Sequence, residues 1–294
     1  MENNNEELQY INLIKEILEK GIDEITRNGN TCSIFGSMMK FSLIDGKIPI
    51  LTTKKVAIKT CFEELMWFIK GNTDNKLLQQ KNVKIWNDNS TREFLDSQGL
   101  FHLKENDLGP VYGHQWRYFN AEYIDCNTDY KGKGIDQLSY IINCLKDPDK
   151  RTSRRLIISS WNPCQLNEMA LPPCHIMIQF NVRAGKYLSC AMYQRSCDMG
   201  LGVPFNITSY SFLTHLIAHH CDLEAESFIY FMGNCHIYKD HIESLNLQIK
   251  NIPYQFPKIL IKNKYDNIED YSYTDIEWLE KYKSYDKINM KMIA

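Results

Sequence analysis

Long apolar runs are missing from this sequence of 294 residues. No stretch approaches the roughly 18 consecutive apolar residues that a membrane-spanning helix needs. The first ten residues, MENNNEELQY, lack the basic start and apolar stretch of a signal peptide. We therefore expect a cytoplasmic protein with no membrane partner.

A surplus of one charge is missing as well, because 34 Lys and Arg residues stand against 36 Asp and Glu residues. With nearly equal numbers of basic and acidic residues, the protein has no overall positive charge to attract DNA. Any anion-binding site must therefore be local.

Paired cysteines are absent too. Ten cysteines are scattered along the chain, but no C-x-x-C or H-E-x-x-H motif occurs. We therefore expect reduced thiols and no metal site. Internal repeats and Gly-, Ser- or Pro-rich linkers are also missing, which favours a single domain over residues 1–294.

Hydrophobic spacing indicates where helices and strands lie. A loop is expected at 27–31, and short helices and loops at 72–107. The other expected helices cover 6–20, 57–70, part of 134–149 and about 208–220. The expected strands cover 33–42, 156–161, 176–182, 187–193 and 228–232. The predicted fold class is α+β, rich in sheet.

Cys174 follows two prolines in ALPPCH and precedes an apolar strand. Free cysteines are usually small buried hydrophobic residues, but a strand edge can also present a nucleophile. A nucleophilic thiol needs positive charge nearby, because a thiol of pKa about 8.5 is only slightly ionised at neutral pH. Arg195, at the end of the next strand, would lie close to Cys174 if the two strands form a hairpin.

The segment YQRSCDMGLGVPFN, residues 193–206, continues from that strand. It places Arg195, Ser196 and Asp198 before a glycine turn, with Asn206 ahead of a helix. The pattern is typical either of a pocket for a phosphate and a base or of a surface turn.

A second basic cluster precedes the strand at 156–161. It consists of Arg151, Arg154 and Arg155. Arginine suits forked phosphate binding, but a solvated strand cap is the alternative.

Glu64 lies in the predicted helix 57–70. Its helical neighbours are Thr60, Cys61, Trp67 and Phe68, with no basic partner. An apolar setting raises a carboxyl pKa toward the range useful for acid–base catalysis. The alternative is a glutamate at the edge of the apolar stripe.

His236 and Tyr238 alternate with apolar residues and should face one side of a strand. Two polar rings can hold a sugar hydroxyl or form a satisfied buried pair. Asp240 and His241 nearby also suggest metal ligands, but no zinc motif supports that interpretation.

Taken together and in this order, these segments resemble the thymidylate synthases over about residues 25–294. The blocks that carry the resemblance are PILTTKK, EELMWFIKG, VKIW, DLGPVYGHQWR, WNP, MALPPCH, YQRSCDMGLGVPFN and HIY. It implies a large, mixed and mostly antiparallel sheet flanked by helices, with the sheets of two copies packed back to back in a homodimer. Residues 1–24 would be an N-terminal helix and extension, and 263–294 a C-terminal segment with a lid.

The resemblance also implies a reaction, the methylation of dUMP at C5 to give dTMP. The co-substrate would be 5,10-methylenetetrahydrofolate, which supplies the carbon and a hydride and leaves as dihydrofolate. Cys174 would add to C6 of the uracil ring and so activate C5. Glu64 would organise water and move protons at O4, and Tyr112 would help to remove the C5 proton. No metal is implied.

The same resemblance assigns the binding residues. Those implied to bind dUMP are Arg27, Arg195 and Ser196 at the phosphate, Asn206 at the uracil amide edge, His236 and Tyr238 at the ribose 3′-hydroxyl, and Arg154 and Arg155 from the neighbouring subunit. Those implied to bind the folate are Asp198 at the pterin, Ile85, Trp86, Asn89, Leu201, Gly202 and Phe205 along the cleft, and Met292, Ile293 and Ala294 in the lid.

Three departures from the family pattern affect these assignments. The run Arg-Asn-Gly-Asn-Thr at 27–31 is one residue shorter than the family's phosphate loop. The run DPDKRTSRR is longer than usual, so Arg151 competes with Arg27 as a phosphate ligand. Asn234 stands where an aspartate is familiar, a change that we expect to be tolerated.

Other functions compete with this one. Deoxycytidylate hydroxymethylase shares the fold, nucleophile and folate donor, but is expected to carry an aspartate at position 206, where Asn206 can read uracil. A non-catalytic RNA-binding protein of the same fold is disfavoured by the intact catalytic positions and near-neutral charge, which leaves RNA binding as a secondary property at most. A cysteine hydrolase using Cys174 and His175 is disfavoured because neighbouring strand residues face opposite sides.

Overall fold

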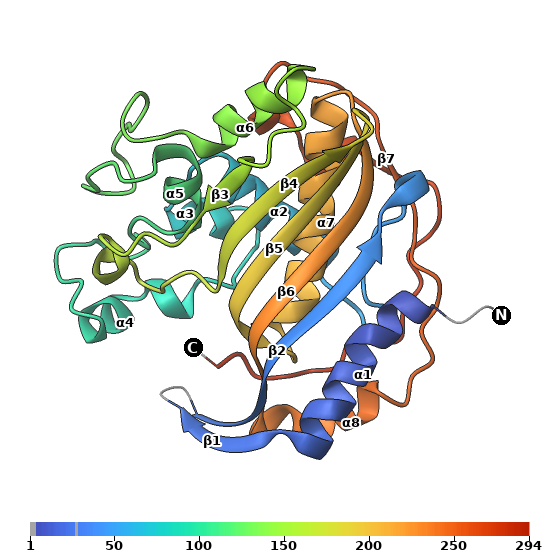
Figure 1. Cartoon of the computed structure of the whole chain (residues 1–294). Coiled ribbons are helices and arrows are strands. Elements are labelled where there is room, and N and C mark those ends of the chain that lie inside the picture. Colours follow the sequence, from blue (N-terminus) through green and yellow to red (C-terminus); the bar gives the residue numbers. More distant parts are fainter. Residues whose placement is uncertain (1–3, 27–28, 294) are drawn as a thin grey trace.

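A mixed β-sheet forms the centre of the computed structural model, which describes residues 4–26 and 29–293 (Figure 1). Within those residues six strands pair in the order β1–β2–β6–β5–β4–β3. The strands are β1 Ile22–Thr26, β2 Gly29–Ser42, β3 Ile157–Ser159, β4 His175–Arg183, β5 Tyr187–Asp198 and β6 Glu224–Tyr238. All neighbours are antiparallel except β5 and β6, which are parallel. The α+β class and the mixed, mostly antiparallel sheet are confirmed.

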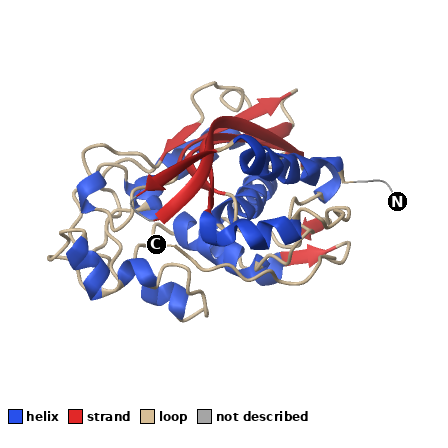
Figure 2. Ribbon diagram, turned by 90° about the horizontal axis from the view of Figure 1, so that it is seen from below, coloured by secondary structure: helices blue, strands red, loops and turns tan. Residues whose placement is uncertain are grey.

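Helices cover mainly one side of this sheet (Figure 2). Helix α7, Gly202–His220, connects the parallel strands β5 and β6 and packs on both. Because it is nearly all buried, it reads as apolar on most sides. The other helices are α1 Asn5–Lys20, α2 Ile58–Ile69, α3 Asn75–Gln79, α4 Arg92–Ser97, α5 Tyr112–Tyr118, α6 Gln137–Lys146 and α8 Ile242–Gln248. Sheet and helices share one hydrophobic core.

Helix α1 is fastened at its first turn by two polar side chains. Asn4 caps it by accepting from the Glu7 N–H. The buried Glu7 carboxylate accepts from the backbone N–H groups and hydroxyls of Thr52 and Thr53, at 2.6–2.9 Å. This fixes the path of the chain just before Lys54.

The last part of the chain contains a second, smaller sheet and then a long segment whose described residues form no helix or strand. Strands β7, Ile259–Ile261, and β8, Ile276–Trp278, form a small antiparallel pair. The segment that follows passes close to the lower end of β6 in Figure 1. Across residues 4–26 and 29–293, no helix is long and apolar enough to cross a membrane.

The long elements confirm the predictions from hydrophobic spacing, and the differences lie at their ends. The loop expected at 27–31 is wrong for Gly29–Thr31, which belong to β2, and β1 was not predicted. Strand β1 is exposed along its whole length and therefore has no alternating pattern. Asn206 is not ahead of a helix but inside α7, which begins at Gly202.

Candidate active site

Cys174 and Arg195 meet where β4 begins and β5 ends, as the predicted hairpin requires. The Arg195 N–H donates to the Cys174 carbonyl at 2.8 Å. The Arg195 side chain donates to the carbonyls of Pro173, at 2.8 Å, and Pro172, at 2.9 Å. Its guanidinium also lies 5.4 Å from the centre of the Trp161 ring. Arg195 thus holds the loop that presents Cys174.

The thiol of Cys174 does not have the lowered pKa that the sequence led us to expect. Burial raises the pKa of the thiol, the charge of Arg195 opposes that rise, and Asp198 adds to it. Burial is the largest effect, so the net pKa lies above its ordinary value. In this state of the protein Cys174 rests as a neutral thiol.

Tyr112, the first residue of α5, lies next to Cys174, and Glu64, on the buried side of α2, lies close enough to Tyr112 to affect it electrostatically. The Tyr112 hydroxyl accepts from the Cys174 N–H at 2.7 Å. Burial raises the pKa of Tyr112 well above its usual range, and the charges of Cys174 and Glu64 add to the rise. Tyr112 therefore stays a phenol at neutral pH.

The Glu64 carboxyl is buried among aromatic rings, as its helical neighbours predicted. Burial raises its pKa to about 7, and a hydrogen bond from Trp86 Nε1 at 2.7 Å acts in the opposite direction. A carboxyl with this pKa can take up and release a proton near neutral pH.

His175 follows Cys174 but cannot act as its base. Burial lowers the pKa of His175 to about 3. Its Nδ1 atom is hydrogen-bonded to the Tyr210 hydroxyl at 2.7 Å, and its ring stacks on Tyr112. A ring that weakly basic does not take a proton from a thiol at neutral pH, which disfavours the cysteine hydrolase.

The end of β5 and the start of α7 form another side of the candidate site. Ser196 and Asp198 are directly opposite Asn234 and His236 on β6. A Cβ atom added at Gly202 would lie 3.7 Å from both the Asn206 amide oxygen and the Asp198 side chain. Asp198 and Asn206 therefore flank Gly202.

Asp198 is ionised although it is poorly accessible. Burial raises its pKa, but contacts with His241, His236 and the Gly200 N–H outweigh burial, and the net pKa is lowered. The buried Lys54 donates to the Gly200 carbonyl, and burial lowers the pKa of Lys54 to about 8.

His241 connects this wall to the C-terminal segment. Its Nε2 atom donates to the Lys291 carbonyl at 2.7 Å, and its Nδ1 lies 3.8 Å from Asp198 Oδ1. Gly200 is required here, because a Cβ atom would come within 2.5 Å of His241 Nδ1 and 3.0 Å of the Met290 sulfur.

The site predicted from the sequence did not include Lys54 or His241. Lys54 lies in PILTTKK, residues 49–55, three residues after the apolar Leu51, a signal that could have indicated its burial. His241 was considered only as a metal ligand. In the described ranges, no group of three or more His, Cys, Asp or Glu residues is placed to hold a metal ion.

His236 and Tyr238 lie together on β6, as predicted, with ring centres 5.2 Å apart. Beside Tyr238 is a cavity of about 340 Å³. Its lining includes Gly29 and Asn30 and the C-terminal residues 291–293.

The residues expected along the folate cleft are spread over three segments. Trp86 donates to Glu64, and Ile85, next to it, packs on the core. The amide nitrogen of Asn89 is buried and has no hydrogen-bond partner among the described residues, so it is available to a ligand. Leu201 and Phe205 are half-buried on either side of Gly202, and Met292 borders the cavity beside Tyr238.

The basic cluster before β3 is separate from this site. Arg151 donates to the carbonyls of Gly185 and Lys146, and Gly185 lies in the turn at the opposite end of the β4–β5 hairpin from Cys174. This position argues against Arg151 as a phosphate ligand in the site of the same chain. Arg154 and Arg155 are exposed. Arg27 and Ala294 lie outside the described residues.

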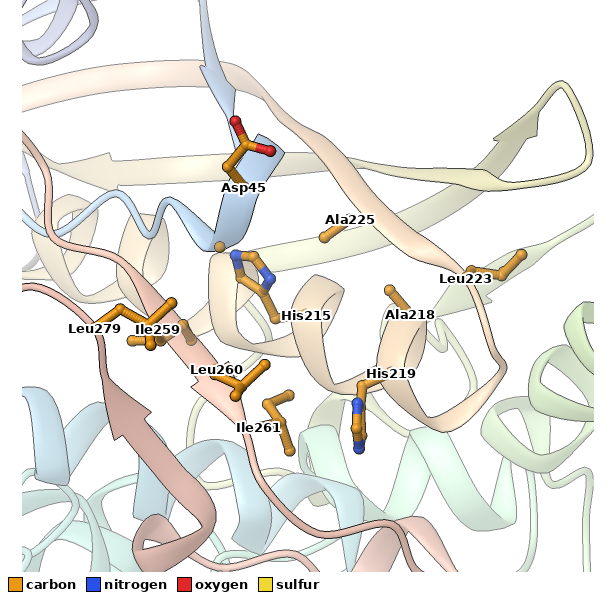
Figure 3. A pocket seen from close by; sticks show the side chains of 11 residues that line it. Asp45, His215, Ala218, His219, Leu223, Ala225, Ile259, Leu260, Ile261 and Leu279 are labelled. Carbon is orange, nitrogen blue, oxygen red and sulfur yellow. The ribbon is translucent and has the colours of Figure 1, made fainter.

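A second pocket, of about 230 Å³, contains none of the predicted site residues (Figure 3). It lies between α7, β7 and the start of β6. His215 and His219 line it, and each has its Nε2 atom on a backbone carbonyl, Lys47 and Asn263 respectively. Burial lowers the pKa of His215 to about 4, so the ring stays neutral.

Comparison with known proteins shows to which family this chain is similar. A family model described as thymidylate synthase matches residues 8–294. The bifunctional dihydrofolate reductase-thymidylate synthase of Paramecium tetraurelia is 52% identical over 289 residues, which are 98% of this chain and 61% of that protein. The protein of the same name from Plasmodium berghei is 52% identical over 293 residues, 99% of this chain and 49% of that protein.

The chain therefore spans about half the length of several curated relatives that it matches. The thymidylate synthase of Candida albicans differs in this respect. It is 47% identical over 311 residues, which cover 98% of each chain.

We expect the Glu64 carboxyl to titrate with a midpoint near pH 7, well above the usual value of about 4.3. Replacing Trp86 with Phe removes the N–H that stabilises the carboxylate, so the midpoint should rise further. The measurement is ¹³C NMR of labelled glutamate carboxyls, assigned with Glu64→Gln. Trp278→Phe in β8 is the control, and equal midpoints in the two Trp variants would contradict the assignment.

Proposed function

Because the chain belongs to the thymidylate synthase family, we propose that it converts dUMP to dTMP with 5,10-methylenetetrahydrofolate as co-substrate. The observation that carries the proposal is the joining of Cys174, Arg195 and Tyr112 by hydrogen bonds beside a buried carboxyl of pKa about 7. The folate supplies the methylene carbon and the hydride, and leaves as dihydrofolate.

Cys174 is the proposed nucleophile. Once the thiol proton has left to solvent, the thiolate sulfur forms a bond to C6 of uracil and the electron pair of the C5–C6 double bond moves toward C5 and O4. C5 then bonds to the methylene carbon as the bond from that carbon to the folate nitrogen breaks. Burial disfavours the thiolate, while the charge of Arg195 favours it. Arg195 also keeps N–H donors for a ligand, because only two of the five in its guanidinium hold the proline carbonyls.

Glu64 and Tyr112 are the proposed proton carriers. A carboxyl of pKa about 7 exchanges protons with the pyrimidine O4 without a large energy cost in either direction. Tyr112 remains a neutral hydroxyl that accepts from the Cys174 N–H, so its own hydrogen is free to orient a water molecule near C5.

The remaining residues are proposed to bind the two ligands. Arg195 and Ser196 bind the phosphate, Asn206 the uracil amide, and His236 with Tyr238 the ribose. The ionised Asp198 binds the pterin, and its fixed position beside Gly202 supports this role. Ile85, Trp86, Asn89, Leu201 and Phe205 line the folate cleft. Met292, Ile293 and Ala294 are proposed to close over the ligands, and the hydrogen bond of His241 to the preceding residue, Lys291, supports this.

We also propose a homodimer with the two sheets packed back to back. Met38, Phe231, Tyr193 and Met177 are successive register partners across β2, β6, β5 and β4. They form an apolar row on one face of the sheet, and Met38 is 53% exposed, Phe231 43% and Met177 43%. Such a row favours burial against a partner. The exposed Arg154 and Arg155 would then reach the neighbouring phosphate site.

Replacing Cys174 with Ser should reduce dTMP formation by at least about 1,000-fold, because the covalent route is lost. Dihydrofolate absorbance measures turnover, and mass spectrometry with 5-fluoro-dUMP and folate measures the covalent complex. Cys164→Ser, at an exposed cysteine, should leave both unchanged. Undiminished turnover in the Cys174 variant would refute the proposed nucleophile.

Asn206→Asp distinguishes this activity from deoxycytidylate hydroxymethylation. A carboxylate cannot donate to the uracil O4, whereas it can accept from the cytosine amino group. We expect the ratio of kcat/KM for dUMP to that for dCMP to fall at least about tenfold. Asn12→Asp, at an exposed position of α1, is the control. An unchanged ratio would remove Asn206 from its proposed role.

Phe231→Arg should separate the subunits, because the sheet face would then bury an unpaired charge. We expect the dimer dissociation constant to rise at least about 100-fold, measured by analytical ultracentrifugation. Phe101→Arg is the matched control, because Phe101 is 74% exposed outside the sheet. Equal behaviour of the two variants would argue against this interface.

A further inference from the structure

Four polar side chains form a continuous line from the exposed strand β1 to His236. The Ser33 hydroxyl donates to Glu24 Oε2 at 3.0 Å. The amide nitrogen of Asn234 donates to Ser33 Oγ at 3.4 Å. The amide oxygen of Asn234 lies 3.0 Å from His236 Nδ1. The line crosses β1, β2 and β6, and Ser33 is the direct register partner of His236.

The direction of each hydrogen bond in this line follows from its first member. An exposed carboxylate at neutral pH only accepts, so Glu24 takes the single hydrogen of Ser33. Ser33 can then only accept from Asn234, which turns the Asn234 NH₂ group toward Ser33 and its oxygen toward His236. An amide oxygen accepts, so the hydrogen of the imidazole must lie on Nδ1.

The charge state of His236 completes the argument. Burial lowers the pKa of His236, and His241 acts in the same direction, while the charge of Asp198 and a hydrogen bond to the Asn234 backbone oppose them. The net effect keeps the ring neutral at pH 7. A neutral imidazole with its hydrogen on Nδ1 has a lone pair on Nε2.

We propose that Asn234 is a positioning residue that orients His236 so that Nε2 meets the ligand as a hydrogen-bond acceptor. The ligand group that fits is a hydroxyl, because it can donate to that lone pair. Given the function proposed above, on which this identity rests, the group is the ribose 3′-hydroxyl of dUMP. Asn234, which stands where an aspartate is familiar in the family, thus determines whether His236 Nε2 accepts or donates in this subsite.

A carboxylate at position 234 would reverse that setting over part of the pH range. It would place a negative charge beside His236 Nδ1 and favour the imidazolium form, in which Nε2 donates instead of accepting. It would also be unable to donate to Ser33, whose hydroxyl would then face two carboxylates. The difference between Asn and Asp here is therefore one of hydrogen-bond direction.

The first test uses the ligand-free protein and long-range ¹H–¹⁵N NMR of the His236 ring, assigned with His236→Gln. At pH 7 we expect a neutral ring with the hydrogen on Nδ1. Asn234→Asp should raise the pKa of His236 by about 1 to 3. Asn181→Asp, which adds the same charge at an exposed position of β4, should not.

A second variant keeps the test independent of folding problems at position 234. Ser33→Ala removes the acceptor that orients the Asn234 amide, so both tautomers of His236 should be populated. A hydrogen on Nε2 in the unchanged protein, or an unaltered tautomer in Ser33→Ala, would overturn the proposal.

Kinetics link the positioning role to the ligand. The discriminating ligand is 3′-O-methyl-dUMP, whose ether oxygen can only accept, whereas the hydroxyl of dUMP can also donate. With Asn234→Asp, the KM for 3′-O-methyl-dUMP should fall relative to the KM for dUMP below the new pKa of His236, where Nε2 donates. A pH-independent KM ratio would contradict the ligand assignment. If dUMP is not turned over at all but NMR finds the hydrogen on Nδ1, the proposed function fails and the polarity of His236 stands.

Discussion

The attachment of Arg195 to the loop before β4 is the interaction on which the site depends. One arginine reaches three consecutive residues, Pro172, Pro173 and Cys174, through two side-chain donors and its own N–H. The two prolines have no backbone N–H, so they cannot donate to neighbouring strands. The loop can therefore be held only through their carbonyls, which need a donor from another segment. By supplying it, Arg195 determines where the sulfur of Cys174 lies relative to β5 and everything that β5 carries.

Burial controls the chemistry of this site more than charge does. It raises the pKa of the Cys174 thiol and of Glu64, and lowers that of His175 and Lys54. In each case the neutral form gains. Asp198 is the exception, because His241 and a backbone N–H compensate its burial. At neutral pH the thiol of Cys174 and the ring of His175 are therefore uncharged and Glu64 is partly ionised, while Asp198, Arg195 and Lys54, with its pKa of about 8, carry charge.

Features that depend on local spacing could be predicted from the sequence, and features that depend on tertiary burial could not. The apolar periods of α1 and α2 and the meeting of Cys174 with Arg195 follow from residues close in sequence. The apolar neighbours of Glu64 also indicated its raised pKa correctly. The exposed strand β1 has no period to detect, and the early start of α7 is hidden behind glycine and proline, which usually end helices. The pKa direction of Cys174 depends on how deeply several distant segments bury it, which one residue pair does not reveal.

The pairing of β2 with β6 joins parts of the chain that are far apart in sequence, since Thr31 pairs with Tyr238, 207 residues later (238 − 31). During synthesis on a ribosome, β2 emerges early and has to wait for its partner until most of the polypeptide has been made. Contacts of such long range form slowly, and an unpaired strand edge is prone to aggregation while it waits. The side chains around His236 are thus assembled among the last, so a truncated nascent chain would hold Cys174 and Arg195 without a complete pocket around them.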